Sequence, residues 1–82
     1  MKAHTKEEKF ILTLHDLAEA AGDPQAEISR YAIGEKIGMH PKGIDTICNQ
    51  LAQANFIKKV GDVLVYLTPN GERLYQSLIE EA

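Results

Sequence analysis

The sequence predicts a mostly helical α+β domain with a three-helix core, a short β-hairpin and a C-terminal helix. Three observations lead to this fold class. Amphipathic stretches with helix-capping residues occupy most of residues 5–54. Two runs rich in β-branched and aromatic residues follow, separated by the turn signal Gly61-Asp62. A Thr-Pro pair then opens another amphipathic stretch. The 82 residues suffice for one small domain, residues 1–82, and leave no room for a second.

The first helix is expected to begin after Thr5. The Thr5 hydroxyl can accept from the backbone N–H of Glu8, and the Glu8 side chain can reach back to Thr5, which is the capping-box pattern. Gly22 ends the helix, and Asp23-Pro24 prevents it from continuing. The apolar residues of this stretch fall on one helical face: Phe10, Ile11, Leu14, Leu17, Ala18 and Ala21.

A second helix is expected over residues 30–37. Ser29 is a favourable N-cap residue, and Gly38 stops the helix because glycine readily adopts the left-handed conformation of a helix end. Ile28, the one strongly apolar residue in the preceding connection, is expected in a short strand.

The third helix is expected over residues 41–54. Pro41 suits the first helical position, His40 serves as its N-cap, and Asn55 suits a left-handed ending. Only three residues separate this helix from the second, and one of them is glycine, which is the spacing of a helix-turn-helix. Its apolar residues share one face: Ile44, Ile47, Cys48 and Leu51.

A hairpin follows the third helix directly, which makes the predicted helix-turn-helix winged. Its strands are expected at 56–60 and 63–68, joined by the two-residue turn Gly61-Asp62. Thr68-Pro69 then repeats the combination of cap and proline and begins a last helix at 69–80. The apolar side of that helix comprises Leu74, Tyr75, Leu78 and Ile79.

Three stretches, in this order and at these spacings, resemble winged helix-turn-helix domains of small prokaryotic transcription regulators of the multiple-antibiotic-resistance regulator type. Residues 28–39 resemble the second helix and its turn. Residues 44–57 resemble the recognition helix and its exit, and Leu67-Thr68-Pro69-Asn70-Gly71 resembles the entry to the last helix. The resemblance implies a cytoplasmic DNA-binding transcription regulator. The third helix (41–54) would lie in the major groove, and the hairpin (57–67) would be the wing.

The formal charge of −3 is unevenly distributed along the chain. Residues 28–68 hold five Lys and Arg against three Asp and Glu and are net +2. Residues 1–27 are net −3 and residues 69–82 are net −2. The helix-turn-helix and hairpin are therefore the only net positive block, which suits DNA binding through one face. The surplus neutralises few phosphates, so we expect a monomer to bind weakly and to lose affinity quickly as salt rises.

Binding to double-stranded DNA requires base-reading side chains on the third helix and cations at the phosphates. Asn49, for example, could pair with adenine N6 and N7 in the major groove. The alternative interpretation is that such residues are simply solvated positions of an amphipathic helix. The candidate DNA-binding residues on the two helices and the wing are Arg30, Lys36, Lys42, Thr46, Asn49, Gln50, Lys58 and Lys59.

A homodimer through the terminal helices would double the DNA-binding surface. The first and last helices carry more apolar side chains than a short chain needs on one side, although closing the core of a monomer is an equally good explanation. The candidate interface residues are Phe10, Ile11, Leu14, Leu74, Tyr75, Leu78 and Ile79.

The sequence offers no catalytic motif and no reason to expect a cofactor, so we expect no enzyme. Cys48 lies on the predicted core face and is expected to be buried. His4, His15 and His40 fall in different elements, which favours solvated or capping roles over metal ligation. No apolar run is long enough to cross a membrane, and a small-molecule pocket is not evident in so short a chain.

A second function remains open, namely a winged-helix protein–protein interaction module without specific DNA binding. The resembled regulators commonly have serine-arginine where this chain has Asp45-Thr46. A carboxylate repels phosphate, although aspartate can also accept from cytosine N4. The wing turn is short, and the total charge is negative. These features favour the protein-binding alternative.

Overall fold

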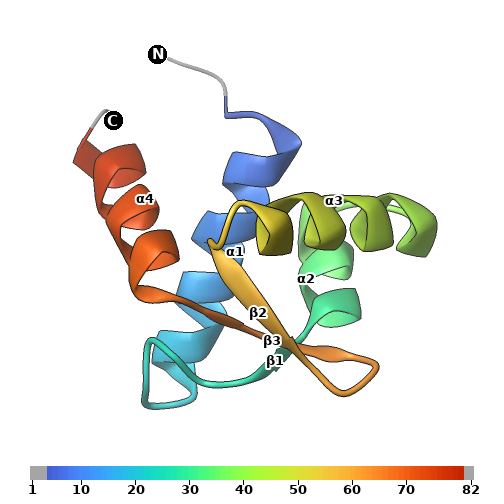
Figure 1. Ribbon diagram of the computed structural model, residues 1–82, viewed down its shortest axis with the longest axis horizontal. Coiled ribbons are helices and arrows are strands. Elements are labelled where there is room, and N and C mark those ends of the chain that lie inside the picture. Colours follow the sequence, from blue (N-terminus) through green and yellow to red (C-terminus); the bar gives the residue numbers. More distant parts are fainter. Residues whose placement is uncertain (1–3, 81–82) are drawn as a thin grey trace.

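The computed structural model describes residues 4–80 and confirms a mostly helical α+β fold (Figure 1). Helix α3 runs crosswise over α1 and α2, with which it packs, and α4 lies against α1 on the other side. No helix within residues 4–80 has the length and apolar character that crossing a membrane requires. The elements in chain order are α1 (Lys6–Ala20), β1 (Ile28–Ser29), α2 (Arg30–Ile37), α3 (Pro41–Gln53), β2 (Ile57–Val60), β3 (Leu64–Leu67) and α4 (Pro69–Glu80).

Capping residues set the helix boundaries as the sequence predicts. The Thr5 hydroxyl accepts from the Glu8 backbone N–H at 3.1 Å, and the Thr5 N–H donates to the Glu8 carboxylate at 2.8 Å, which completes the capping box. Gly38 ends α2 with a φ of 72°, in the left-handed region. His40 caps α3 by accepting from the Lys42 N–H at 3.2 Å. These caps hold the three-residue turn between α2 and α3.

The three strands form an antiparallel sheet in the order β1-β3-β2. Val60 pairs with Leu64, so the hairpin turn spans residues 61–63 and is one residue longer than the expected Gly61-Asp62 turn. Val63 therefore lies in the turn and not in a strand, with 38% of its surface exposed. Its carbonyl accepts from the Arg30 backbone N–H at 3.0 Å, which ties the wing to the start of α2.

The core is built from the apolar faces of the helices and the inner face of the hairpin. Because strand side chains alternate, Val65 and Leu67 of β3 point inward together with Ile57 of β2. Cys48 is buried beside them, as expected. The remaining core residues come mainly from the helices: Phe10, Ile11, Leu14, Ala18, Ile33, Ile44, Ile47, Leu51 and Leu78.

This burial corrects part of the expected dimer interface. Phe10, Ile11 and Leu14 have no exposed surface in the single chain, and Leu78 is 2% exposed. These four side chains fill the core of one chain, so they offer no surface to a second copy. Three of the expected interface residues keep exposed surface on α4: Leu74, Tyr75 and Ile79.

Thr68 joins the end of α3 to the start of α4. Its hydroxyl donates to the Asn55 carbonyl at 2.5 Å, and its N–H donates to the Phe56 carbonyl at 3.1 Å. The same hydroxyl accepts from the Gly71 N–H at 3.0 Å, which caps α4. Asn55, with a φ of 66°, makes the expected left-handed ending just beyond α3. These contacts fix the wing relative to α3.

His15 departs from the solvated or capping role expected of the histidines. It is 2% exposed and stacks on Tyr75 of α4, with ring centroids 3.5 Å apart. Its Nε2 lies 3.2 Å from a Glu72 oxygen and 3.3 Å from a Glu19 oxygen. The packing of α4 against α1 therefore buries this ring between the two helices. Within residues 4–80, no group of His, Cys, Asp or Glu side chains is arranged to hold a metal ion.

Candidate nucleic-acid interface

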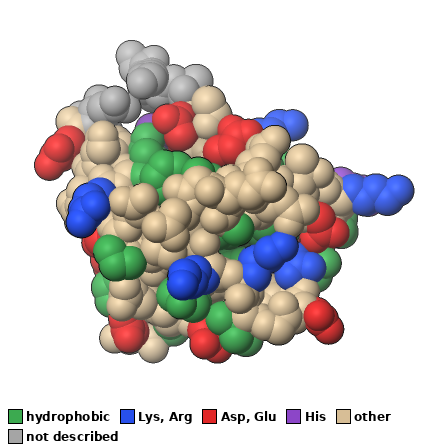
Figure 2. Space-filling model, viewed as in Figure 1, with side chains coloured by type: hydrophobic (Ala, Val, Ile, Leu, Met, Phe, Trp, Pro, Cys, Tyr) green, Lys and Arg blue, Asp and Glu red, His purple; other side chains and the backbone are tan. Residues whose placement is uncertain are grey.

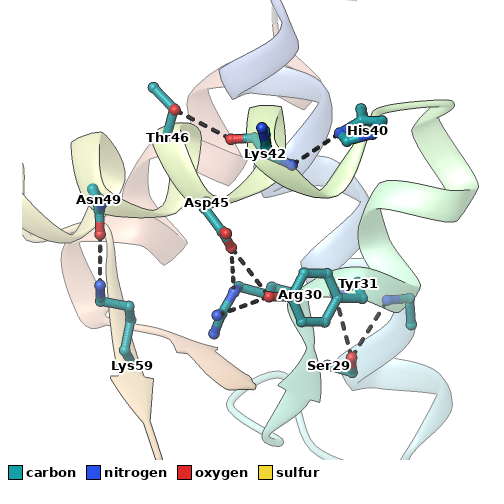
Figure 3. A network of polar contacts seen from close by, with 10 residues as sticks. Ser29, Arg30, Tyr31, His40, Lys42, Asp45, Thr46, Asn49 and Lys59 are labelled. Atoms are coloured by element: carbon teal, nitrogen blue, oxygen red, sulfur yellow. Dashed lines mark hydrogen bonds and ion pairs between the residues drawn. The ribbon is translucent and has the colours of Figure 1, made fainter. Parts of the chain in front are cut away.

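The outer side of α3 carries the polar residues expected there. Successive helical residues turn by about 100°, so these residues fall opposite the core face of the same helix. The Thr46 hydroxyl donates to the Lys42 carbonyl one turn earlier, at 3.2 Å (Figure 3). We call the four exposed residues the α3 face: Lys42, Thr46, Asn49 and Gln50.

The wing places its two lysines on opposite sides. Lys59 lies on the same side of β2 as the buried Ile57. Its Nζ donates to Oδ1 of Asn49 at 2.6 Å (Figure 3). Lys58 points to the other side of the hairpin, because neighbouring strand residues alternate. The structure thus brings Lys59, but not Lys58, to the α3 face. The Lys59 contact also occupies the amide oxygen that Asn49 would need to pair with adenine.

An ion pair connects the start of α2 with α3. Arg30 Nε donates to Asp45 Oδ1 at 3.0 Å, and the Tyr31 hydroxyl donates to the same oxygen at 3.3 Å (Figure 3). Arg30 Nη2 also donates to the Tyr31 hydroxyl at 3.1 Å, and its guanidinium carbon lies 4.8 Å from the centre of the Tyr31 ring. Arg30, expected to touch the DNA backbone, is therefore already paired inside the chain.

The Tyr31–Asp45 contact was not anticipated from the sequence. The sequence marks Asp45 as unusual, but its partners lie 14 and 15 residues earlier on another helix, at no helical or strand spacing. The opposite charges of Arg30 and Asp45, on the two helices of the helix-turn-helix, are the one feature of the sequence that could have indicated this contact. Lys36, by contrast, is exposed on α2.

The surroundings change the acid–base properties of two groups near α3. Burial alone would lower the pKa of Arg30, but its hydrogen bonds to Asp45 and Tyr31 outweigh burial and raise that pKa. Burial raises the pKa of the Cys48 thiol to about 11. Arg30 therefore stays charged at neutral pH, and Cys48 stays a protonated thiol with low nucleophilicity.

A hollow of about 250 Å³ lies between α3, the start of α2 and β2. Two of its lining residues are cations, Arg30 and Lys59, and one is the carboxylate of Asp45. Asn49 and Cys48 complete the lining. Figure 2 shows Lys and Arg side chains below α3 and at its right-hand end, with acidic side-chain atoms between these two groups. The surface around α3 thus combines polar uncharged groups with flanking cations and the carboxylate of Asp45.

The backbone of nearly the whole chain superimposes on solved structures of known fold. The fold is a winged helix-turn-helix. The PcaV transcriptional regulator from Streptomyces coelicolor, solved with its natural ligand, superimposes with a TM-score of 0.71 at 20% sequence identity. NadR in complex with 4-hydroxyphenylacetate gives 0.71 at 22% identity. YusO from Bacillus subtilis gives 0.70 at 18% identity. PcaV is a transcriptional regulator, the class of protein that the sequence resembles.

The similarity covers nearly all of this chain but only about half of each neighbour. It spans 94% of this chain and 54% of PcaV and of NadR, and 93% of this chain and 53% of YusO. No protein-family model and no curated protein matches the sequence. At these identities the comparison establishes the winged helix-turn-helix fold, and the small molecules bound by PcaV and NadR are properties of those proteins.

Proposed function

We propose that this protein is a DNA-binding transcription regulator. The observation that carries the proposal is the α3 face, four exposed polar side chains on the second helix of a helix-turn-helix, with a wing lysine bonded to one of them. Since the proposed ligand is genomic duplex DNA, we also propose a cytoplasmic location. The structural neighbours are transcription regulators, which supports the proposal at the level of fold.

In the proposed complex, α3 lies in the major groove and the wing follows the sugar–phosphate backbone. Gln50 and Asn49 read base edges, Asn49 after releasing Lys59. Lys42, Lys36 and Lys59 contact phosphates, and each such contact contributes about −0.9 to the slope of log affinity against log salt. Lys58, on the far side of the hairpin, would reach only a backbone that curves around the wing.

The direct test reverses charges on the proposed face. Lys42→Glu combined with Lys59→Glu should abolish binding to duplex DNA in a fluorescence-anisotropy titration, because both cations become anions beside phosphates. Lys6→Glu combined with Arg73→Glu is the matched control. It makes the same change in net charge at exposed positions of α1 and α4 that belong neither to the α3 face nor to the wing. If the two double variants bind equally well, the proposed face is wrong.

We further propose a homodimer that forms through the terminal helices. The support is the exposed apolar surface that remains on α4, where Ile79 is 43% exposed and Leu74 and Tyr75 are half-buried. Ile79→Asp should shift a dimer to a monomer in size-exclusion chromatography with light scattering. Ser77→Asp adds the same charge at an exposed position of the same helix and should leave the dimer intact. A monomeric wild-type protein would refute the dimer.

Two contacts favour the alternative, a protein–protein interaction module. Asp45 occupies Arg30 and Asn49 occupies Lys59, so part of the surface that would meet DNA is engaged within the chain. A winged helix could use the same surface for a protein partner. The absence of any binding to random-sequence duplex at about 50 mM salt, together with a stably co-purifying protein, would decide for this alternative.

A further inference from the structure

Asp45 lines the hollow between the wing and α3, where it pairs with Arg30. Its side chain is 48% exposed, whereas that of Arg30 is 15% exposed. Both contacts of Asp45 end on one oxygen, Oδ1, which receives Arg30 Nε and the Tyr31 hydroxyl. The pair is thus reachable from solvent at its carboxylate end, where a larger anion could enter the hollow.

A carboxylate and a phosphate present similar oxygen pairs to a guanidinium group, so they compete for the same donors. Arg30 uses Nε for Asp45 and Nη2 for Tyr31. The second cation of the hollow, Lys59, is held by the neutral amide oxygen of Asn49. A phosphate that enters the hollow could bind Lys59 by replacing the neutral amide of Asn49. To bind Arg30, it would have to displace the carboxylate of Asp45.

We propose that Asp45 is an internal competitor for Arg30 that limits the affinity of this face for DNA phosphate. The proposal rests on the proposed DNA-binding function and adds a residue that regulates it. In the free protein, Asp45 and Tyr31 hold the guanidinium against α3. A backbone phosphate seated in the hollow between Lys59 and Arg30 replaces the carboxylate. DNA that places no phosphate there leaves the pair closed and binds with one contact fewer.

The position of Asp45 on the helix supports this role over base reading. Asp45 lies toward the flank of α3, about 100° from the buried Ile44, and its contacts lead to α2 and not outward with the α3 face. In Figure 3 its side chain points to Arg30 and Tyr31, whereas Thr46 points away from them. Flanks of a recognition helix meet the walls of the major groove, where the phosphates are.

The test compares Asp45→Asn with a matched neutralisation, Glu35→Gln, at an exposed position of α2. Anisotropy titrations with one duplex at several salt concentrations give the affinity and its salt slope. For Asp45→Asn we expect the Kd at low salt to fall roughly tenfold, the effect of about one added charge-assisted hydrogen bond, and the slope to steepen by about 0.9. Glu35→Gln should give a much smaller change.

Arg30→Gln, alone and combined with Asp45→Asn, tests whether the gain acts through Arg30. The gain should disappear in the Arg30→Gln background, and Tyr31→Phe, which loosens the pair without changing charge, should give a partial gain. A gain that persists without Arg30, or an equal gain from Glu35→Gln, overturns the proposal. Wild-type binding that Asp45→Asn does not improve overturns it while leaving the proposed function standing. If no variant binds duplex, the proposed function fails as well.

Discussion

Gly71 lies in the first turn of α4, against the backbone of Phe56 between α3 and β2, and replacing it with alanine should be strongly destabilising. A Cβ atom at this position would lie 2.0 Å from the carbonyl oxygen of Phe56 and 2.9 Å from Leu67 Cδ1. Ordinary contacts between carbon and a carbonyl oxygen begin near about 3.3 Å, so the backbone must move by more than ~1 Å. The Phe56 carbonyl cannot retreat freely, because it accepts from the Thr68 N–H at 3.1 Å.

The cost of Gly71→Ala follows from these contacts. Overpacking a tight site costs about 1–3 kcal/mol, and breaking the hydrogen bond to the Phe56 carbonyl adds about 1–3 kcal/mol. We therefore expect a loss of roughly 3–5 kcal/mol, which lowers the Tm of a domain this size by about 15–30 °C. A domain of this length has a free energy of unfolding of about 4–12 kcal/mol, so the substitution should remove at least about a quarter of that stability.

Urea and thermal unfolding followed by circular dichroism measure this effect. Gly43→Ala is the control, because its Cβ would meet only the flexible end of the Met39 side chain at 3.0 Å. That change should be neutral or stabilising by up to about 1 kcal/mol, since alanine favours a helix interior over glycine. Helix propensity also favours alanine at position 71, so only the steric clash can destabilise the variant. A Gly71→Ala protein within about 1 kcal/mol of wild type would refute the reasoning.

Three further predictions concern the buried polar groups. Cys48 has its pKa raised by burial from 9.0 to about 11, so the unfolded chain ionises first and stability is lost as pH rises from 9 to 11, by up to about 3 kcal/mol. Urea titrations at both ends of that range should show a smaller loss for Cys48→Ala, and equal losses would contradict the assignment. His15→Ala should cost about 2–4 kcal/mol in urea unfolding, because it removes a buried ring stacked on Tyr75, and a loss below about 1 kcal/mol would show that α4 does not depend on the stack. Thr68→Val should cost about 1–2 kcal/mol, because it keeps the shape but leaves the Gly71 N–H and the Asn55 carbonyl without their hydroxyl partner, and an unchanged Tm would count against this role of the cap.

The helix boundaries could be predicted because their causes are local. A capping box, a left-handed glycine and a proline at the first helical position each act within four residues, so Thr5, Gly38 and Pro41 place helix ends directly. The core face of α3 follows from periodicity for the same reason. Thr68 and Gly71, noted only as part of a motif, are explained by the close passage of α4 beside Phe56.

Features that depend on packing between distant segments could not be predicted. The pairing of Val60 with Leu64, and not the turn signal alone, sets a three-residue turn at the wing. His15 is buried by a helix that begins more than fifty residues later. The Arg30–Asp45 pair joins two helices whose relative angle no local pattern specifies. The same reason explains why Phe10 and Leu14 proved to be core residues and not an interface.

The central claim is that α3 and the wing bind duplex DNA. Its most direct test is a fluorescence-anisotropy titration of the wild-type protein with genomic duplex fragments, including the region upstream of its own gene, at two salt concentrations. We predict nanomolar-to-micromolar binding that weakens as salt rises and disappears in the Lys42→Glu, Lys59→Glu variant. No binding at low salt, or binding that this variant retains in full, would contradict the claim.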